Sequence, residues 1–224
     1  MPRRLALGVA AAAFAAALLL AGGGEARISV WLAAGSLIAC AVVWFESGAG
    51  SAKEIALVAT LAGVAAAGRV LFTAVPGVQP VTLIAIVSGA ALGLRAGVGV
   101  GMLAAFVSNF FLVQGAWTPY QMLAWGACGA AGALLAPLVR RRVALAAVAC
   151  VLGFGFSVFM DAWEWFAFWP HDWKSLAFVV GRGVPFDVAH AVGNVVLAFA
   201  VGPELRRVLD RYGRRLHVEI VWAS

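Results

Sequence analysis

Arg69 is the costliest residue in this sequence, because it stands alone as a charge inside a long apolar run. If that run crosses a membrane, a charge near its middle costs on the order of 2.5–3.5 kcal/mol and needs a partner. Asp187, His190 and Asn194 follow one another at helical spacing, so they share one face of the helix expected there. We expect Asp187 or Asn194 to satisfy Arg69 from across a helical bundle.

This constellation, which Asn109 and Gln114 are expected to join, has three interpretations. Interhelical hydrogen bonds hold membrane helices together, so the group is consistent with a purely structural polar clamp. Ionisable groups inside a membrane usually mark function, which favours a ligand-linked site. In the third interpretation, Asp187 and His190 are the acid/base pair of an intramembrane enzyme. A single buried histidine is more often a hydrogen-bonded core residue than a metal ligand, so we predict no metal.

Aromatic and amide side chains gather in three short segments, at residues 76–80, 114–121 and 161–174. The third segment holds four of the nine tryptophans, Trp163, Trp165, Trp169 and Trp173. An interfacial aromatic belt explains such rings, and a lid or stacking wall over a flat organic ligand explains them equally well. The predicted substrate-binding residues are Arg69, Gln79, Asn109, Gln114, Trp117, Tyr120, Gln121, Trp125, Trp163, Asp187, His190 and Asn194.

Motifs of known catalytic centres are missing from the chain. It contains no His-Glu-x-x-His, no Gly-x-Ser-x-Gly and no phosphate-binding Gly-x-x-x-x-Gly-Lys sequence. Cys40, Cys128 and Cys150 share no metal-type spacing and are expected to be free thiols. We therefore predict neither an enzyme nor a cofactor, and a transporter that uses ATP would need its ATPase on another chain.

The composition requires a membrane as solvent. Of the 224 residues, 64% are hydrophobic and 12% are charged, whereas a soluble domain is about a quarter charged. Hydrocarbon cannot satisfy free backbone groups, and the apolar runs lack the alternation of barrel strands. The expected fold class is all-α, a polytopic transmembrane helical bundle. The net charge of +6 lies mainly at the ends of spans, which indicates topology signals and contacts with anionic membrane lipid rather than nucleic acid.

Eight helices are expected along the chain. They lie at about 5–21, 28–45, 54–75, 81–94, 96–113, 119–139, 143–160 and 183–203. The stretch 81–94 is short for a span, so it and the glycine-rich helix that follows are expected to be tilted or broken. The positions of lysine and arginine predict a multi-pass plasma-membrane protein with both termini cytoplasmic and the three aromatic segments facing outward.

The distribution of polar and apolar residues divides the chain into three parts. Residues 1–50 form an expected transmembrane hairpin, 54–205 a six-helix substrate-binding core, and 206–224 a basic cytoplasmic tail. Residues 1–24 also resemble a secretory signal, in which two arginines precede an alanine-rich apolar stretch. Cleavage there would leave every later span oriented as before.

Small residues dominate the helix expected at 54–68. Ala62 and Ala66 lie four residues apart, a spacing that lets another helix approach closely. That surface either packs within the chain or binds a separate membrane subunit, and the spacing alone does not choose between them.

Several of these segments together resemble the substrate-binding S components of energy-coupling factor vitamin transporters. The resemblance covers about 54–205, and its most specific block is 108–126. It is carried by Ala62 to Phe72, Pro76 to Pro80, Ser108 to Phe111, Gln114 to Pro119, Gln121-Met122, Trp125-Gly126 and His190 to Asn194.

The resemblance implies a six-helix membrane protein that binds a vitamin or related micronutrient on its outer face. It also implies docking onto a transmembrane coupling subunit that is driven by two cytoplasmic ATPase subunits. In that family an Ala-x-x-x-Ala motif makes the docking contact, which here falls on Ala62 and Ala66, and the loop at 76–80 caps the ligand. The group that takes up cobalamin or other corrinoids is the most similar. The amino-terminal hairpin departs from the six-helix pattern.

Two hypotheses of different classes therefore follow from the sequence. The first is a substrate-capturing subunit of a micronutrient importer, which binds ligand while its partners hydrolyse ATP. The second is a membrane scaffold or assembly protein without a ligand, in which the polar clamp is structural and the tryptophans form a belt. Substitution of Trp117 or Asn109 would then alter stability alone.

Overall fold

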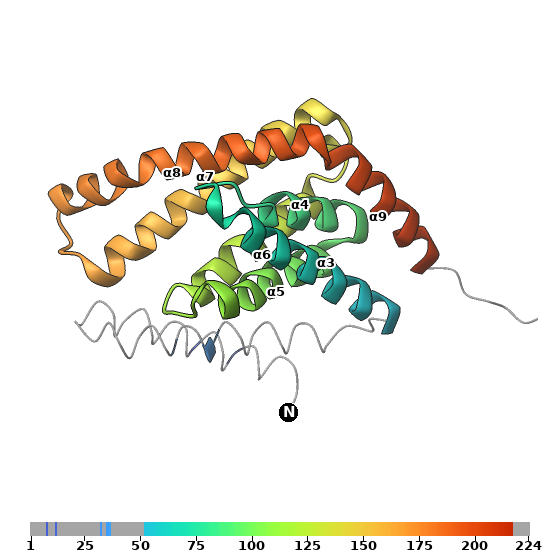
Figure 1. Ribbon diagram of the computed structural model, residues 1–224. Helices are drawn as coiled ribbons and strands as arrows, with labels where there is room; N and C mark the ends of the chain where they lie inside the picture. The colour runs from blue at the N-terminus through green and yellow to red at the C-terminus, as the bar shows by residue number, and fades with distance from the viewer. Residues whose placement is uncertain (1–7, 9–11, 13–31, 33–34, 37–51, 217–224) are drawn as a thin grey trace, which may run out of the picture.

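The computed structural model describes residues 8, 12, 32, 35–36 and 52–216 (Figure 1). The helices expected at 5–21 and 28–45, and with them the hairpin at 1–50, lie outside the described residues. Within the described part, seven α-helices and two short 3-10 turns account for the secondary structure, and no strand occurs there. The predicted all-helical class is thus confirmed for this part of the chain.

Four of the described helical segments are long and apolar enough to cross a membrane. They are Ala52–Ala74, which comprises α3 (Ala52–Leu71) and the 3-10 turn η1 (Phe72–Ala74), then α5 (Leu94–Leu112), α7 (Arg142–Phe168) and α8 (Trp173–Ala200). Such segments indicate a membrane protein. The remaining helices are α4 (Val81–Leu92), α6 (Thr118–Leu134) and α9 (Gly202–Leu216), and a second 3-10 turn, η2, covers Leu138–Arg140.

Helix α4 is short but deeply buried. Its 12 residues extend about 18 Å at 1.5 Å per residue, well under the 30 Å or so of a bilayer core. Ten of those residues are buried, so α4 is a central helix surrounded by others. Gly93, with a φ of 95°, links it directly to α5. The pair expected to be tilted or broken at 81–113 consists of two unbroken helices joined by this abrupt turn, which favours glycine.

Glycines let α4, α5 and α6 touch backbone to backbone. A Cβ atom on Gly129 would lie 2.1 Å from the carbonyl oxygen of Gly97, and one on Gly89 would lie 1.9 Å from that of Gly129. No side chain fits at such distances, and small residues are how membrane helices pack most closely. The glycine-rich start of α5 is therefore a packing surface, and it holds α4, α5 and α6 as one unit.

Helices α7 and α8 form a long antiparallel hairpin, which corrects two predicted boundaries. The span expected at 143–160 continues to Phe168, and the one expected at 183 begins at Trp173, so only four residues of the predicted loop 161–174 connect the helices. Figure 1 shows the two helices running side by side to their shared turn. Acidic and indole side chains lower the hydropathy there without breaking the helix. Asp172 caps α8 by accepting a hydrogen bond from the Ser175 amide at 2.8 Å.

Helix α9 occupies a stretch that the sequence indicated only as a basic tail. Pro203 lies at its start, where the missing amide proton costs nothing. One face is buried, at Gly202, Arg206, Leu209 and Gly213, and the helix packs chiefly against α4. Its single apolar stripe is interrupted by arginines, so hydropathy alone gave no signal for it.

Candidate functional site

Arg69, near the end of α3, lies in a buried network of neutral hydrogen-bonding groups. The residue is 7% exposed. Its Nη1 donates to Ser108 Oγ at 2.7 Å and to Asn109 Oδ1 at 2.6 Å, and its Nε donates to Gln79 Oε1 at 3.3 Å. None of these acceptors carries a charge. The guanidinium is therefore solvated by dipoles, which supply the hydrogen bonds but do not neutralise the charge.

Asn109 on α5 extends this network to the start of α6. Its amide nitrogen donates to Thr118 Oγ1 at 2.9 Å and to Gln121 Oε1 at 2.8 Å. Thr118 in turn donates to Gln114 Oε1 at 2.9 Å and accepts from the amide of Gly115. Asn109 thus uses its carbonyl toward the cation and its amide toward α6. We refer to Arg69, Gln79, Ser108, Asn109, Gln114, Thr118 and Gln121 as the Arg69 network.

A second chain of hydrogen bonds runs beside this network. Trp125 Nε1 donates to Thr82 Oγ1 at 3.0 Å, and Thr82 Oγ1 lies 3.2 Å from His190 Nε2. His190 Nδ1 lies 2.6 Å from the carbonyl oxygen of Gly77. A carbonyl only accepts, so Nδ1 carries the proton and Nε2 is left to accept from the Thr82 hydroxyl. This is the pattern of a neutral imidazole that ties α8 to the 76–80 loop.

Trp125 connects the two groups through its ring. The Arg69 Cζ atom lies 4.8 Å from the centroid of the Trp125 ring system, a cation–π distance. The same indole stacks on Phe156 of α7, with centroids 4.2 Å apart and planes 17° from parallel. Trp125 is fully buried. It is therefore a packed partner of Arg69, and access for a ligand would have to come from another side.

The predicted partners of Arg69 on α8 are wrong. Asp187, His190 and Asn194 are all buried on one face, at 1%, 0% and 0% exposure, as their spacing predicts. No hydrogen bond joins Asp187 or Asn194 to Arg69 among the described residues. The reason is the packing order, because α3 packs chiefly against α5 and α8 packs chiefly against α7.

Five polar atoms on α7 and α8 lack a hydrogen-bond partner within the described part of the chain. The Asn194 amide donates to the His190 carbonyl at 2.9 Å, but its Oδ1 accepts nothing. The others are Ser157 Oγ, Asp161 Oδ2, Asp187 Oδ2 and the Trp163 indole nitrogen. Unsatisfied buried polar atoms are costly. Together these atoms offer three acceptors, one donor and one hydroxyl to water or to a ligand between α7 and α8.

The aromatic residues at the start of α6 and the end of α7 meet at a rim. The rings of Tyr120 and Trp163 lie 5.1 Å apart, and Trp163 makes an edge contact with Phe168 at 5.5 Å. Trp117, 36% exposed, folds its ring over Gly115. Tyr120 and Trp163 thus form a joint surface.

Residues 50–203 match the model of a family of unknown function, DUF6580. The chain belongs to this family. The matched region contains α3 to α8 and so coincides closely with the six-helix core expected at 54–205. No curated protein matches the chain, and no solved structure does.

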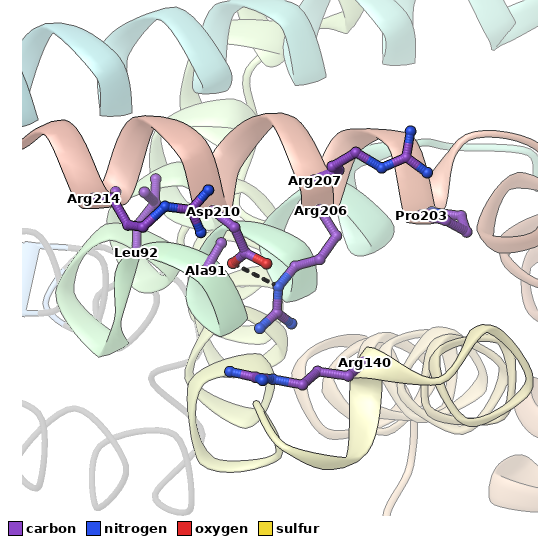
Figure 2. Close-up of a pocket in the computed structure, with 9 residues that line it drawn as sticks. Ala91, Leu92, Arg140, Pro203, Arg206, Arg207, Asp210 and Arg214 are labelled. Atoms are coloured by element: carbon purple, nitrogen blue, oxygen red, sulfur yellow. Dashed lines mark hydrogen bonds and ion pairs between the residues drawn. The ribbon is translucent and has the colours of Figure 1, made fainter.

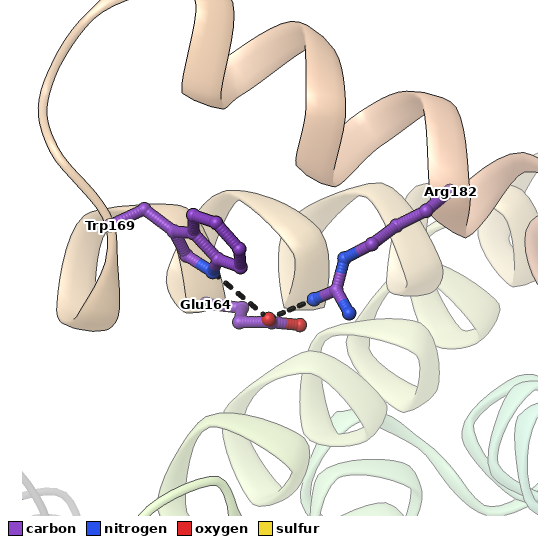
Figure 3. Close-up of polar contacts among 3 residues, drawn as sticks. All are labelled: Glu164, Trp169 and Arg182. Atoms are coloured by element: carbon purple, nitrogen blue, oxygen red, sulfur yellow. Dashed lines mark hydrogen bonds and ion pairs between the residues drawn. The ribbon is translucent and has the colours of Figure 1, made fainter.

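Trp165 and Trp169 make their hydrogen bonds within the α7–α8 hairpin. Glu164 forms an ion pair with Arg182 and accepts a hydrogen bond from Trp169 Nε1 at 3.2 Å (Figure 3). Trp165 Nε1 donates to Ser175 Oγ at 3.0 Å. Trp173 is 81% exposed. Of the four tryptophans, only Trp163 therefore has its ring against α6, and the others stabilise or border the hairpin turn.

Ala62 and Ala66, the predicted docking residues, lie inside the described bundle. Their exposures are 2% and 3%, and the helix that carries them packs chiefly against α5. Of the two alternatives, packing within the chain is the one seen for this pair. The small residues that α3 exposes are Ala52, Ala56, Ala59, Gly63 and Ala67, and a Cβ atom on Gly63 would meet open space.

Sequence reasoning missed four residues of the site. Ser108 and Thr118 bind Arg69 and Asn109 through short hydroxyls, and Thr82 and Phe156 join the Trp125 group. Single hydroxyls in apolar helices give no periodic signal, although Ser108 directly precedes Asn109. No group of three or more potential metal-binding side chains occurs within the described residues.

Proposed function

We propose that the chain is the substrate-binding membrane subunit of an energy-coupling factor type importer. It captures a vitamin or related micronutrient on the outer face of the plasma membrane, and its termini lie in the cytoplasm. Cobalamin or another corrinoid is the best candidate, because the aromatic rim suits a large flat ligand. Separate ATPases drive transport through a coupling subunit.

The observation that carries this proposal is the buried, uncompensated charge of Arg69. Burial of an ionised group is expensive, and a purely structural role is served as well by an apolar side chain. Among the described residues, the groups that accept hydrogen bonds from this guanidinium are all neutral, and they come from α5 and the 76–80 loop. A carboxylate or phosphate group on a ligand would complete the site, as arginine binds either in bidentate fashion. The unsatisfied acceptors of Asp161 and Asp187 would take hydrogen-bond donors of the same ligand.

The proposed contact with the coupling subunit requires a surface other than Ala62 and Ala66, because both are buried. The exposed small-residue face of α3, at Ala59, Gly63 and Ala67, offers close approach to a helix from another chain.

Titration of tryptophan fluorescence tests the proposal. The detergent-purified chain is titrated with cobalamin, cobinamide, riboflavin, thiamine, biotin and folate, with correction for absorbance by coloured ligands. We expect saturation at nanomolar concentrations by one of them and no ATP hydrolysis by the chain alone. ATPase activity of the purified chain, or absence of binding by a sample that unfolds sharply, would contradict a capture subunit.

The two tyrosines of the chain provide a matched pair of variants. Tyr120→Ala removes a ring from the proposed rim, whereas Tyr212→Ala removes an exposed ring from α9. Loss of one stacking partner is expected to weaken binding about tenfold or more at Tyr120, with no change at Tyr212. Equal effects of the two substitutions would place the ligand elsewhere.

A membrane scaffold remains the second candidate, and one observation favours it. Nε and Nη1 of Arg69 and the amide nitrogen of Asn109 all donate to groups of the same chain, as in a polar clamp that only holds helices together. This alternative predicts that no member of the ligand panel binds and that Tyr120→Ala changes neither binding nor assembly.

A further inference from the structure

A cavity lies at the carboxyl-terminal end of α4, between that helix, η2 and α9. Its volume is about 860 Å³. The residues that line it are Ala91, Leu92, Arg140, Pro203, Arg206, Arg207, Asp210, Gly213 and Arg214. We call this cavity the arginine pocket. It has no residue in common with the Arg69 network.

The charges around the arginine pocket do not balance. Arg207 forms an ion pair with Glu204 at 2.6 Å, and Figure 2 shows its side chain pointing away from Arg206. That leaves three guanidinium groups, those of Arg140, Arg206 and Arg214, against the single carboxylate of Asp210. Cations that share a cavity repel one another, and the repulsion grows where water is partly excluded. The pocket therefore favours an anion.

Arg206 is the buried charged residue of the pocket. The residue is 8% exposed, on the face of α9 that packs against α4. Its Nε donates to Asp210 Oδ1 at 2.9 Å, but its Nη1 atom is buried and has no partner among the described residues. In Figure 2 its guanidinium points across the pocket toward the segment that carries Arg140. A buried guanidinium nitrogen without an acceptor is costly, so its place in the fold indicates a missing acceptor.

We propose that the arginine pocket binds a phosphate group, held by Arg206 and Arg140 and bordered by Arg214. Guanidinium groups bind phosphate oxygens through paired, charge-assisted hydrogen bonds. The cavity is much larger than a bare phosphate ion, so it has room for an organic phosphate or for the headgroup of an anionic phospholipid. Basic pockets between membrane helices are a known type of lipid-headgroup site. The proposal does not depend on the proposed function.

Two measurements on the full chain distinguish the sources of phosphate. In detergent, thermal unfolding is followed as sodium phosphate replaces sodium chloride at constant ionic strength, since a ligand of the folded state raises the unfolding temperature. In nanodiscs of mixed phosphatidylglycerol and phosphatidylcholine, native mass spectrometry reports the lipid that stays bound. Stabilisation by phosphate indicates a soluble ligand, and retention of phosphatidylglycerol alone indicates a headgroup.

Arg206→Gln and Arg211→Gln remove the same charge from the same helix. Arg211 is exposed and does not line the pocket. We expect Arg206→Gln to weaken binding of inorganic phosphate or phosphatidylglycerol about tenfold or more, and Arg211→Gln to change it less than twofold. Equal losses in the two variants, or no binding of either probe by the unsubstituted chain, would overturn the proposal.

A third variant decides the matter if Arg206→Gln does not fold. Asp210 competes with the anion for Arg206, so Asp210→Asn removes the internal rival while keeping its size. The expected result is tighter binding of whichever probe binds the unsubstituted chain. Unchanged or weaker binding would show that Arg206 already has all the partners it needs.

Discussion

Two buried arginines, Arg69 and Arg206, are accommodated in different ways. They are equally buried, at 7% and 8% exposure. Arg69 donates to three neutral side chains from neighbouring elements, whereas Arg206 has one carboxylate on its own helix and an Nη1 atom that no described residue contacts as a hydrogen-bond partner. The comparison teaches that a bundle can hold a guanidinium either by surrounding it with dipoles or by leaving a cavity for an anion.

The two arginine sites are expected to differ most in how much a substitution at each lowers the stability of the protein. Asn109→Leu keeps the volume but removes the hydrogen bonds to Arg69, Thr118 and Gln121. Because a buried cation then loses an acceptor and two further groups lose a donor, we expect the free energy of unfolding to fall by about 3 kcal/mol or more. Thermal unfolding in detergent, followed by circular dichroism, measures the change.

Two other variants are expected to lose less stability than Asn109→Leu and serve as controls. Phe110→Leu alters the adjacent residue, whose side chain is 66% exposed, and is expected to change little. Arg206→Gln in a phosphate-free chloride buffer is expected to cost less than about 1 kcal/mol, because it also relieves repulsion in the arginine pocket. If Arg206→Gln cost as much as Asn109→Leu, the two arginines would not differ in kind.

A smaller effect on stability is expected from the contact between Gly97 of α5 and Gly129 of α6. Gly129→Ala places a methyl group where the backbone of Gly97 now lies, and such overpacking costs about 1–3 kcal/mol. Gly155→Ala is the matched control on α7, where a Cβ atom meets open space. Thermal unfolding of both variants provides the test. Equal stability of the two would mean that α5 and α6 separate at no cost.

The sequence predicted the features that depend on local pattern. Long apolar runs indicated the helical class and four of the six spans expected within the described residues, and helical spacing correctly placed Asp187, His190 and Asn194 on one buried face. It did not predict which helix Arg69 faces, because α3 and α5 are separated in sequence and paired only by packing. Asp172 caps α8 through the Ser175 amide, but the low hydropathy of this stretch concealed the start of the helix.

The two arginine sites differed in how much of each could be foreseen. Asn109 and Gln114 were predicted to join Arg69, whereas Gln79 and Gln121 were predicted only as substrate-binding residues. The arginine pocket was foreseen only as a contact with anionic lipid. Its cavity depends on α9 folding back against α4, and no local pattern in a basic stretch of sequence reveals such a return.

The smallest expected effect concerns the neutral hydrogen-bond chain, which exists beside Arg69 and has no counterpart described at Arg206. Trp125→Phe keeps an aromatic ring against Phe156 but removes the indole N–H that donates to Thr82. One buried hydrogen bond is worth about 1 kcal/mol, so the unfolding temperature should fall by only a few degrees. Trp173→Phe, at an 81% exposed position, should leave it unchanged. A loss at Trp125 as large as that of Asn109→Leu would show that the indole, rather than the amide of Asn109, is the main partner of the Arg69 cation.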